Sequence, residues 1–227
     1  MSNSSLVSYT KISPNSTPRS KKITKITIHH MAGNLSIEGC GREFASPERK
    51  GSSNYGIGTD GRIGMYVEEK NRAWTSSNPD NDDMAVTIEV ANDVIGGNWH
   101  VSDKALASLI DLCTDICERN GIEKLNFTGN KNGNLTMHKY FAATACPGAY
   151  LESKFPYIAN EVNKRLSAKN TKKLESGNDI VWELMNGKHK VKITEVQKAV
   201  KAIDKAKNNA EFNSLYWILY KLVNGNG

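Results

Sequence analysis

The hydrophobic and polar positions of residues 22–165 follow two different periods, which predicts a domain that mixes strands with helices. Residues 23–28 alternate apolar and polar side chains, as a strand with one buried face does. Residues 85–90 are almost continuously apolar, and only Thr87 and Glu89 interrupt the run. A short apolar run of this kind predicts a further strand.

Turn and cap signals divide the remainder of this region. Residues 55–58 and 63–67 flank a Thr-Asp-Gly turn and predict a β-hairpin. A helix is predicted over residues 102–121, with Ser102 as its cap and an Asn-Gly pair at its end. Another helix is expected at 151–166. This order predicts an α/β fold with a mixed central sheet flanked by helices.

The chain divides into two predicted modules. We expect a first domain over 1–166, a polar linker over 167–177 and a small all-helical module over 178–227. Residues 168–227 hold 11 Lys, no Arg and 6 acidic residues, whereas residues 1–167 hold 19 basic and 18 acidic residues. The net charge of +6 therefore lies mostly in the last quarter, where it suits an anionic partner or is a solvated surface.

Composition limits the class of protein. Hydrophobic residues make up 38% and charged residues 24%, which is typical of a globular protein. We find no apolar stretch approaching the roughly 20 residues of a membrane span and no secretory signal pattern. The four cysteines are too few for a disulfide scaffold, so we expect free thiols. Cys113 and Cys117 fall on the apolar face of a predicted helix, which favours a core position over a metal pair.

Candidate metal ligands occur at the end of the first strand and far downstream. A catalytic zinc ion takes three protein ligands, commonly His nitrogen and Cys thiolate, and leaves one position open. His29, His138 and Cys146 would supply such a set. Each alone is more often a structural residue, so the combination carries the hypothesis.

These residues stand in motifs that resemble the amidase-2 family, which shares the peptidoglycan recognition protein fold. The resemblance covers roughly residues 22–165, and its motifs appear in the family's order. They are I-H-H-x-A at 28–32, S-x-x-Y at 52–55 before an Asp-Gly turn at 60–61, I-E at 88–89, and a His followed by A-C-P over 138–147.

The resemblance implies an N-acetylmuramoyl-L-alanine amidase of the endolysin type, with Zn²⁺ bound by His29, His138 and Cys146. Strand alternation places His29 on a polar face with Thr27, and we interpret His30 as a structural residue beside the metal. Alternation alone does not choose firmly between the two adjacent histidines.

Three further residues are assigned catalytic roles through the resemblance. Glu89 is expected to act as general base toward the zinc water, the alternative being a carboxylate paired with a buried Arg or Lys. Tyr55 is expected to donate a hydrogen bond to the oxyanion or to orient the water, with a core tyrosine as the alternative. Thr144 stands where related phage enzymes often carry Lys, so its part in the transition state is the weakest of the three assignments. Trp74 and Asn92 are expected to contact the substrate.

The expected partner is bacterial peptidoglycan, with an anionic wall polymer as a second partner of the module at 178–227. The enzyme is expected in the host cytoplasm, reaching the wall after holin-type release. Alternatives are a peptidoglycan-binding module without activity, a closed structural zinc site, and a nucleic-acid binder. The lysine-rich but arginine-free tail argues against nucleic acid, and membrane insertion is not expected. For 178–227, dimerisation or helical packing is the alternative to wall binding.

Overall fold

The computed structural model describes the backbone of residues 2–185 and the side chains up to residue 168. The chain divides into two compact units, Met1–Leu166 and Ser167–Gly227. Most of the all-helical module predicted over 178–227 lies outside the described residues.

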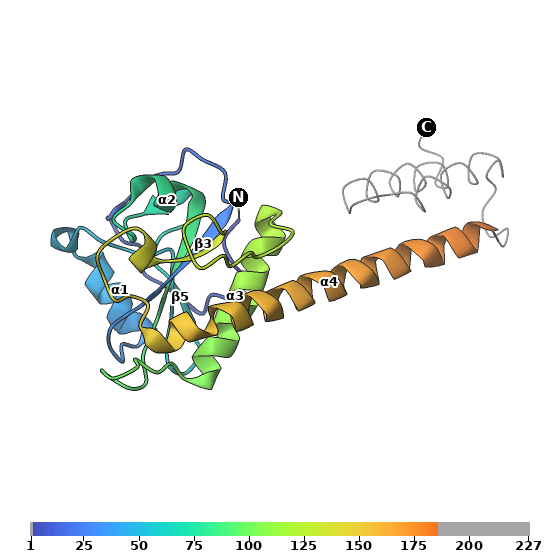
Figure 1. Cartoon of the computed structure of the whole chain (residues 1–227). Helices are drawn as coiled ribbons and strands as arrows, with labels where there is room; N and C mark the ends of the chain where they lie inside the picture. Colours follow the sequence, from blue (N-terminus) through green and yellow to red (C-terminus); the bar gives the residue numbers. More distant parts are fainter. Residues whose placement is uncertain (1, 186–227) are drawn as a thin grey trace. The chain divides into compact units, whose positions relative to one another are not determined.

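A six-stranded mixed sheet forms the centre of the first unit (Figure 1). Its strand order is β1-β5-β4-β7-β3-β8, in which β4 and β5 form an antiparallel hairpin and the other neighbouring pairs are parallel. A separate antiparallel pair joins β2 to β6. The strands are β1 (Tyr9–Thr10), β2 (Ser16–Pro18), β3 (Lys25–His30), β4 (Tyr55–Ile57), β5 (Ile63–Met65), β6 (Asn71–Ala73), β7 (Ala85–Val90) and β8 (Leu135–Met137).

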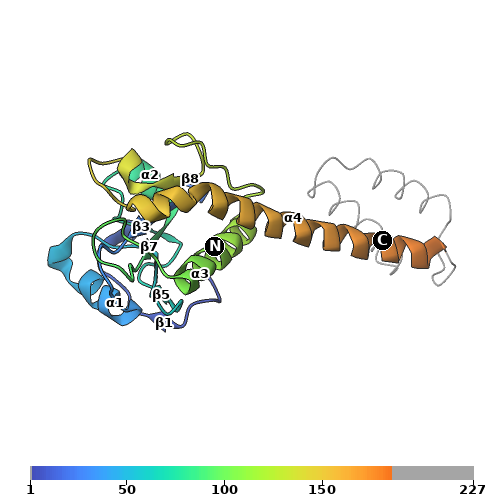
Figure 2. The ribbon, with the colours of Figure 1, turned by 60° about the horizontal axis from the view of Figure 1, so that its bottom comes forward.

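Helices cover both faces of this sheet (Figures 1 and 2). The helices are α1 (Ile37–Ala45), α2 (Pro79–Met84), α3 (Asp103–Asn120) and α4 (Ala149–Met185), with short 3₁₀ turns η1 (Pro47–Arg49) and η2 (His138–Tyr140). Side chains of α3 and the first turns of α4 pack on Ile26, Ile28 and Ile88 in the main hydrophobic core. A smaller cluster joins α1 to Tyr66 on the other face, where Gly56 leaves room for the tyrosine ring.

The capping signals in the sequence mark helix α3 correctly. The Ser102 hydroxyl accepts the Ala105 N–H at its start, and Gly121 ends it with φ +68° while donating to the Cys117 carbonyl. The strands predicted at 23–28 and 85–90 and the predicted hairpin are confirmed as β3, β7 and β4–β5. Cys113 and Cys117 are buried in the main core, so the core interpretation of that pair is confirmed.

Helix α4 is longer than the predicted helix at 151–166. It runs from Ala149 to Met185 and so passes through residues 167–177, which the polar sequence marks as a linker. The boundary between the two compact units falls between Leu166 and Ser167. The segment that joins the units is therefore helical, and the functional division of the chain stays a prediction.

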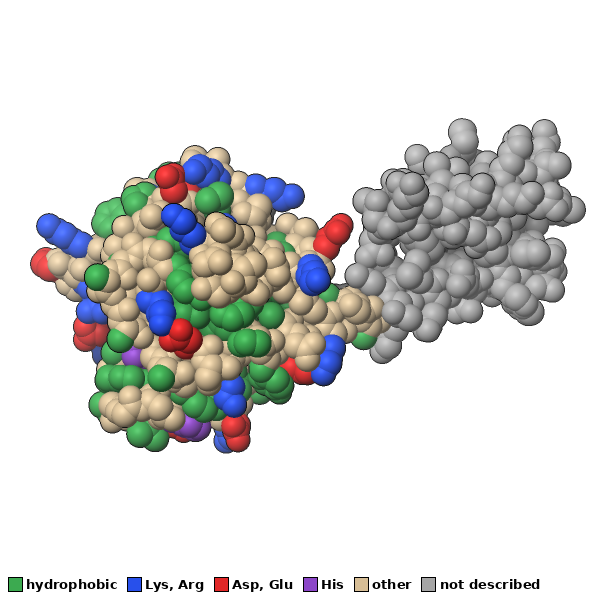
Figure 3. Space-filling model, in the orientation of Figure 1, with side chains coloured by type: hydrophobic (Ala, Val, Ile, Leu, Met, Phe, Trp, Pro, Cys, Tyr) green, Lys and Arg blue, Asp and Glu red, His purple; other side chains and the backbone are tan. Residues whose placement is uncertain are grey.

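The surface of the first unit carries charges of both signs. In Figure 3, basic and acidic side chains are interspersed over the visible face, in keeping with the near balance of charge in residues 1–167. Among the described residues, none of the helices combines the length and hydropathy that crossing a bilayer requires.

Candidate active site

The candidate residues lie at or just after the carboxyl ends of three parallel strands, β7, β3 and β8, at one edge of the sheet. His29 near the end of β3 is the register partner of Glu89 near the end of β7. His138 directly follows β8, which pairs with the other side of β3. The carboxyl ends of neighbouring parallel strands lie at the same edge, the usual position of sites in α/β sheets.

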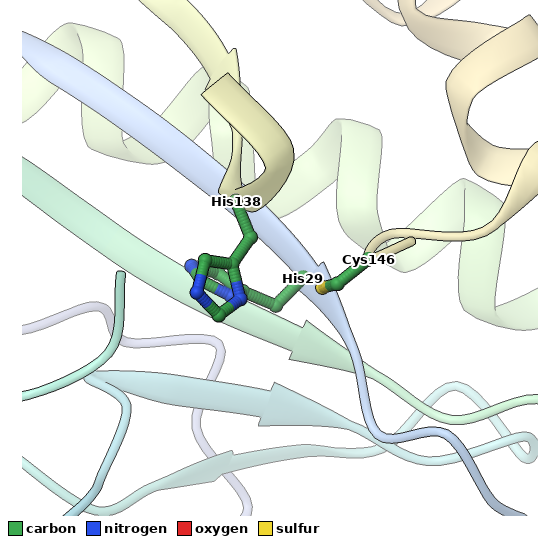
Figure 4. Close-up of side chains that lie close together, drawn as sticks. All are labelled: His29, His138 and Cys146. Atoms are coloured by element: carbon green, nitrogen blue, oxygen red, sulfur yellow. The ribbon is translucent and has the colours of Figure 1, made fainter. Parts of the chain in front are cut away.

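The predicted metal ligands come together at this edge. One ligand atom from each of His29, His138 and Cys146 lies within 4.8 Å of the others, and the imidazole rings have centroids 4.6 Å apart (Figure 4). Zinc ligands stand about 2.0–2.3 Å from the ion, so small side-chain adjustments bring all three atoms into one coordination sphere. The predicted triad is thus a spatial cluster.

The loop that carries Cys146 is held to the end of β3 and to η2. The backbone N–H of His30 points to the Cys146 sulfur at 3.4 Å, and the Lys139 N–H donates to the Cys146 carbonyl at 3.1 Å. The hydroxyl of Thr144 accepts the Cys146 N–H at 3.2 Å. These contacts fix the thiol beside the two imidazoles, and the backbone of His30 contributes to that support.

The electrostatics of the three side chains suit a cation. His29 is fully buried, and burial together with the neighbouring His138 holds its pKa well below the usual value. Burial also lowers the pKa of His138. Both ring nitrogens of His29 and Nε2 of His138 are enclosed without a hydrogen-bond partner. Neutral imidazoles with free nitrogens are the form that binds a metal.

The thiol of Cys146 is the third candidate ligand. Burial raises its pKa, with the Glu89 carboxylate acting in the same direction, so the uncomplexed side chain stays protonated. A bound divalent cation reverses that preference by stabilising the thiolate. Two neutral imidazoles and one such thiol therefore match the donor set of an open zinc site.

Glu89 lies beside this cluster as a carboxylate without a counter-ion. Part of its side chain reaches the surface, but Oε2 is enclosed and has no hydrogen-bond partner. Burial raises the pKa of Glu89 to about 8, against a small opposing effect of Arg49. Among the described residues no Lys or Arg forms an ion pair with it, which removes the alternative of a structural pair.

Tyr55 does not belong to the site, and the prediction of its catalytic role is wrong. It pairs in register with Ile88, one residue before Glu89, so its side chain leaves the opposite face of the sheet. The ring is fully buried in the main core. Its hydroxyl donates to Glu69 Oε1 at 2.7 Å and accepts the Ser4 N–H at 3.0 Å. Tyr55 is the core residue of the alternative interpretation.

The remaining predicted residues, Thr144, Asn92 and Trp74, lie in different environments. Thr144 is exposed, and its observed contact shapes the Cys146 loop. Asn92 is buried and donates to the Trp99 carbonyl at 2.8 Å, which secures the loop after β7. Trp74 is half-buried and lines a cavity of about 350 Å³. The substrate roles of Trp74 and Asn92 stay predictions.

A layer of buried polar side chains lies beneath the candidate ligands, and the sequence analysis does not predict it. Thr27 and Thr136 share a hydrogen bond of 2.9 Å between their hydroxyls, and Asn81 from α2 donates to Thr27 at 3.0 Å. Thr27 is two residues before His29 and leaves the same face. A polar residue inside a strand, Thr27, is the sequence signal for this layer. The sequence gives no sign of its partner Asn81, because that contact depends on tertiary packing.

Comparison with known proteins agrees with this geometry. The family model described as N-acetylmuramoyl-L-alanine amidase (Amidase_2) matches residues 19–149, more than half of the chain. No curated protein matches the sequence.

Solved structures with the same fold include three relevant neighbours. PlyL is 16% identical with a TM-score of 0.53, covering 68% of this chain and 95% of that one. The catalytic domain of XlyA is 18% identical with a TM-score of 0.54, covering 68% and 97%. A mutant endolysin from Bacillus subtilis is 19% identical with a TM-score of 0.54, covering 68% and 97%. At these identities the likeness establishes the shared fold.

Proposed function

The chain belongs to the Amidase_2 family of N-acetylmuramoyl-L-alanine amidases, and on that premise we propose that it is a zinc-dependent peptidoglycan hydrolase of the endolysin type. The bond cleaved is the amide between the lactyl group of muramic acid and L-alanine. The observation that carries the zinc dependence is the cluster of His29, His138 and Cys146, whose ligand atoms lie within 4.8 Å of one another. Unpartnered ring nitrogens in that cluster support the same conclusion.

In the proposed site, His29, His138 and Cys146 hold the metal. When bound, Zn²⁺ supplies Lewis acidity toward the amide carbonyl and lowers the pKa of water. Three protein ligands leave one position for that chemistry.

Glu89 carries the proton in this proposal. Burial raises the pKa of Glu89 to about 8 and so favours proton uptake by its carboxylate. Glu89 takes a proton from the attacking water and passes it to the nitrogen of the departing L-alanine. A bound cation would lower that pKa toward neutrality, where both transfers are efficient.

A binding module without activity is the competing function. A module that only recognises peptidoglycan needs neither a metal-ligating thiol nor an unpaired carboxylate beside it. Leaving Oε2 of Glu89 enclosed and unpartnered costs free energy, and a catalytic role accounts for that cost.

The test is digestion of purified bacterial walls by the full-length chain. We expect free N-terminal alanine to appear without new reducing sugar, and a chelator to abolish its release. New reducing ends would identify a glycosidase. Binding to walls without any released alanine, in zinc-loaded protein, would identify the binding module instead.

The second compact unit is proposed to hold the enzyme on the wall through an anionic wall polymer. The lysine excess of residues 168–227 supports this assignment. Residues 178–227 fused to a fluorescent reporter should label susceptible walls, and labelling should weaken with salt. A reporter that forms dimers and leaves walls unlabelled would show a packing module instead. Access to the wall after a holin-type opening of the host membrane is part of the same proposal.

A further inference from the structure

The three parallel strands that end at the metal edge each supply a threonine two residues before the histidine or glutamate of the site. These threonines stand in register on β7, β3 and β8, and all are fully buried: Thr87, Thr27 and Thr136. Side chains two residues apart along a strand leave the same face of the sheet. The threonine layer therefore lies directly beneath the two imidazoles and the carboxylate.

Hydroxyl groups in this layer cost free energy unless each one has a hydrogen-bond partner. The hydroxyls of Thr27 and Thr136 lie 2.9 Å apart, and Asn81 of helix α2 donates to Thr27 through Nδ2 at 3.0 Å. Thr87 has separate partners in Asn54 and Thr75. Asn81 is therefore the residue that ties helix α2 to the part of the layer beneath the histidines.

The second partner of Asn81 determines how its carboxamide is oriented. Ser76 donates its hydroxyl hydrogen to Asp82 Oδ1 at 2.6 Å, so toward Asn81 Nδ2 at 3.2 Å it can only accept. Both hydrogens of Nδ2 are thus used, one by Ser76 and one by Thr27. The remaining oxygen, Oδ1 of Asn81, is enclosed and has no hydrogen-bond partner. Asn81 is 3% exposed, so solvent does not replace that partner.

His29 needs an acceptor of this kind if it binds a metal ion. A neutral imidazole has one lone pair and one N–H, and a ring that binds a metal through the lone pair gives its N–H to a carbonyl, a carboxylate or water. Both ring nitrogens of His29 are enclosed without a partner. Helix α2 also lies near the imidazoles, since burial lowers the pKa of His138 and Asp82, the neighbour of Asn81, opposes that shift.

The other unpartnered acceptors have different surroundings. Among the described residues, three enclosed side-chain oxygens lack a hydrogen bond, and they belong to Asn81, Asn92 and Glu89. Asn92 lies in the loop after β7, where its amide holds the Trp99 carbonyl at 2.8 Å. Glu89 is the proposed proton carrier. Asn81 is the acceptor that remains for His29, and it is already bonded to Thr27 two residues before that ring.

We propose that Asn81 is a positioning residue for the zinc ligands. Its Nδ2 group fixes the threonine layer beneath them, and its Oδ1 accepts the N–H of His29, directly or through one water molecule. This inference rests on the proposed function, because it requires His29 to bind the ion. The hydrogen bond selects the His29 tautomer whose lone pair faces the metal, and it makes the ring a stronger ligand. Asn81 acts only through that ring.

The zinc affinity of the full-length chain, measured by competition with a chromogenic chelator, is the first measurement. Asn81→Leu has a similar size and no polar atoms, and it should lower the affinity by about 10–100-fold, the usual effect of removing the hydrogen-bond partner of a metal ligand. Asn81→Asp keeps an acceptor oxygen, so its affinity should stay nearer to that of wild type.

Asn163→Leu is the matched control. Asn163 exchanges two hydrogen bonds of 2.8 Å with the backbone of Leu125, and its side chain has no other hydrogen-bond partner among the described residues. This variant should lower the thermal midpoint, as Asn81→Leu does, but keep the wild-type zinc affinity. In the cobalt-substituted protein the visible absorption bands report the coordination geometry. They should shift in Asn81→Leu and stay in place in Asn163→Leu.

Thr27→Val provides a second variant should Asn81→Leu not fold. It removes the hydroxyl that orients Asn81 with little change in shape. Zinc binding should weaken and the cobalt bands should shift, both by less than in Asn81→Leu.

The outcomes separate this role from the proposed function. Wild-type zinc affinity and cobalt bands in the folded Asn81 and Thr27 variants would overturn the positioning role and leave the zinc enzyme intact. Equal zinc losses in Asn81→Leu and Asn163→Leu would trace the effect to general destabilisation and overturn it too. Equal losses in Asn81→Leu and Asn81→Asp would show that the acceptor oxygen has no effect. A wild-type chain that binds no zinc would overturn the proposed function itself.

Discussion

His29 stands opposite Glu89 in the register of the parallel strands β3 and β7, so that the two side chains leave the same face of the sheet. One is a metal ligand in the proposed site and the other its proton carrier. Their spacing is set by backbone hydrogen bonds between two central strands, a more rigid support than a loop.

Glu89→Gln removes the proposed proton carrier while keeping the side-chain shape. We expect kcat to fall by about 10²–10⁴-fold, the usual contribution of a general base, with zinc content unchanged. Release of N-terminal alanine from walls measures the rate, and metal analysis of the same preparation measures the zinc. A variant with wild-type kcat would show that the carboxylate has no part in the chemistry.

The pH dependence of stability offers an independent view of Glu89. Its folded-state pKa of about 8 lies above the ordinary value, so between about pH 4.5 and 8 the folded protein binds the proton more tightly than the unfolded chain. This carboxyl therefore destabilises the metal-free protein progressively as pH rises through that window. Chemical denaturation should show the free energy of unfolding of Glu89→Gln gaining on that of wild type as pH rises, and parallel curves would refute the buried-acid description.

His29 and His138 change the free energy of unfolding with pH in the direction opposite to Glu89. The folded-state pKa values of His29 and His138 are lowered by burial, so the unfolded chain takes up their protons first as the pH falls below about 6.5. The stability that comes from keeping these rings neutral is present above that pH and is lost on acidification. Glu89→Gln leaves this acid limb in place, which lets the two effects be separated in one pair of titrations.

Metal binding should depend on Cys146 and be indifferent to the other buried thiols. Cys146→Ser should lower zinc affinity by at least about 100-fold, since a hydroxyl is a far poorer ligand than a thiolate. Competition with a chromogenic chelator measures the affinity in the folded protein. Cys113→Ala is the control: it opens a small cavity in the main core and should lose stability but keep its zinc. Equal zinc loss in both variants would mean that unfolding, and not ligation, is being measured.

The sequence predicted the parts of the site that strand ends and motif order determine. His29 and His138 come together because the parallel strands β3 and β8 end at one edge, a consequence of fold class, and the loop after η2 brings Cys146 to them. Tyr55 shows the limit of such reasoning. In the register of β4 and β7 it is Gly56 that stands opposite Glu89, and a shift of one residue moves a side chain to the other face. Motif order carries no information on that register.

The sequence pattern does not predict four of the short strands. Strands β1, β2, β6 and β8 are too short to show a period, and they exist because neighbouring segments supply their hydrogen-bond partners. Helix α2 has only six residues, yet its Asn81 and Asp82 support the metal face and the cavity. Their effect on the site arises from tertiary contacts that no local pattern encodes.

Tyr55→Phe tests the corrected assignment. Removing the hydroxyl leaves Glu69 Oε1 and the Ser4 N–H without a shared partner, so we expect a loss of about 1–3 kcal/mol in the free energy of unfolding. The kcat should stay within about twofold of wild type, because the side chain lies across the sheet from the reacting groups. A large fall in kcat at unchanged stability would restore Tyr55 to the catalytic machinery.

Gly148 lets the Cys146 loop pack closely against Trp99 and His30. Although Gly148 is not a candidate ligand, we expect its replacement to weaken zinc binding. Its φ of +84° is unfavourable for any other residue, and an added Cβ would stand 2.8 Å from the Trp99 Cβ and 3.3 Å from the His30 Nδ1. Gly148→Ala must therefore move the loop, and with it the Cys146 sulfur. Gly121→Ala provides the comparison, because Gly121 has φ +68° and open space around it. Both variants should lose about 1 kcal/mol from backbone strain, but only Gly148→Ala should also lose zinc affinity. Equal affinities in the two would show that the position of the Cys146 sulfur does not depend on this packing.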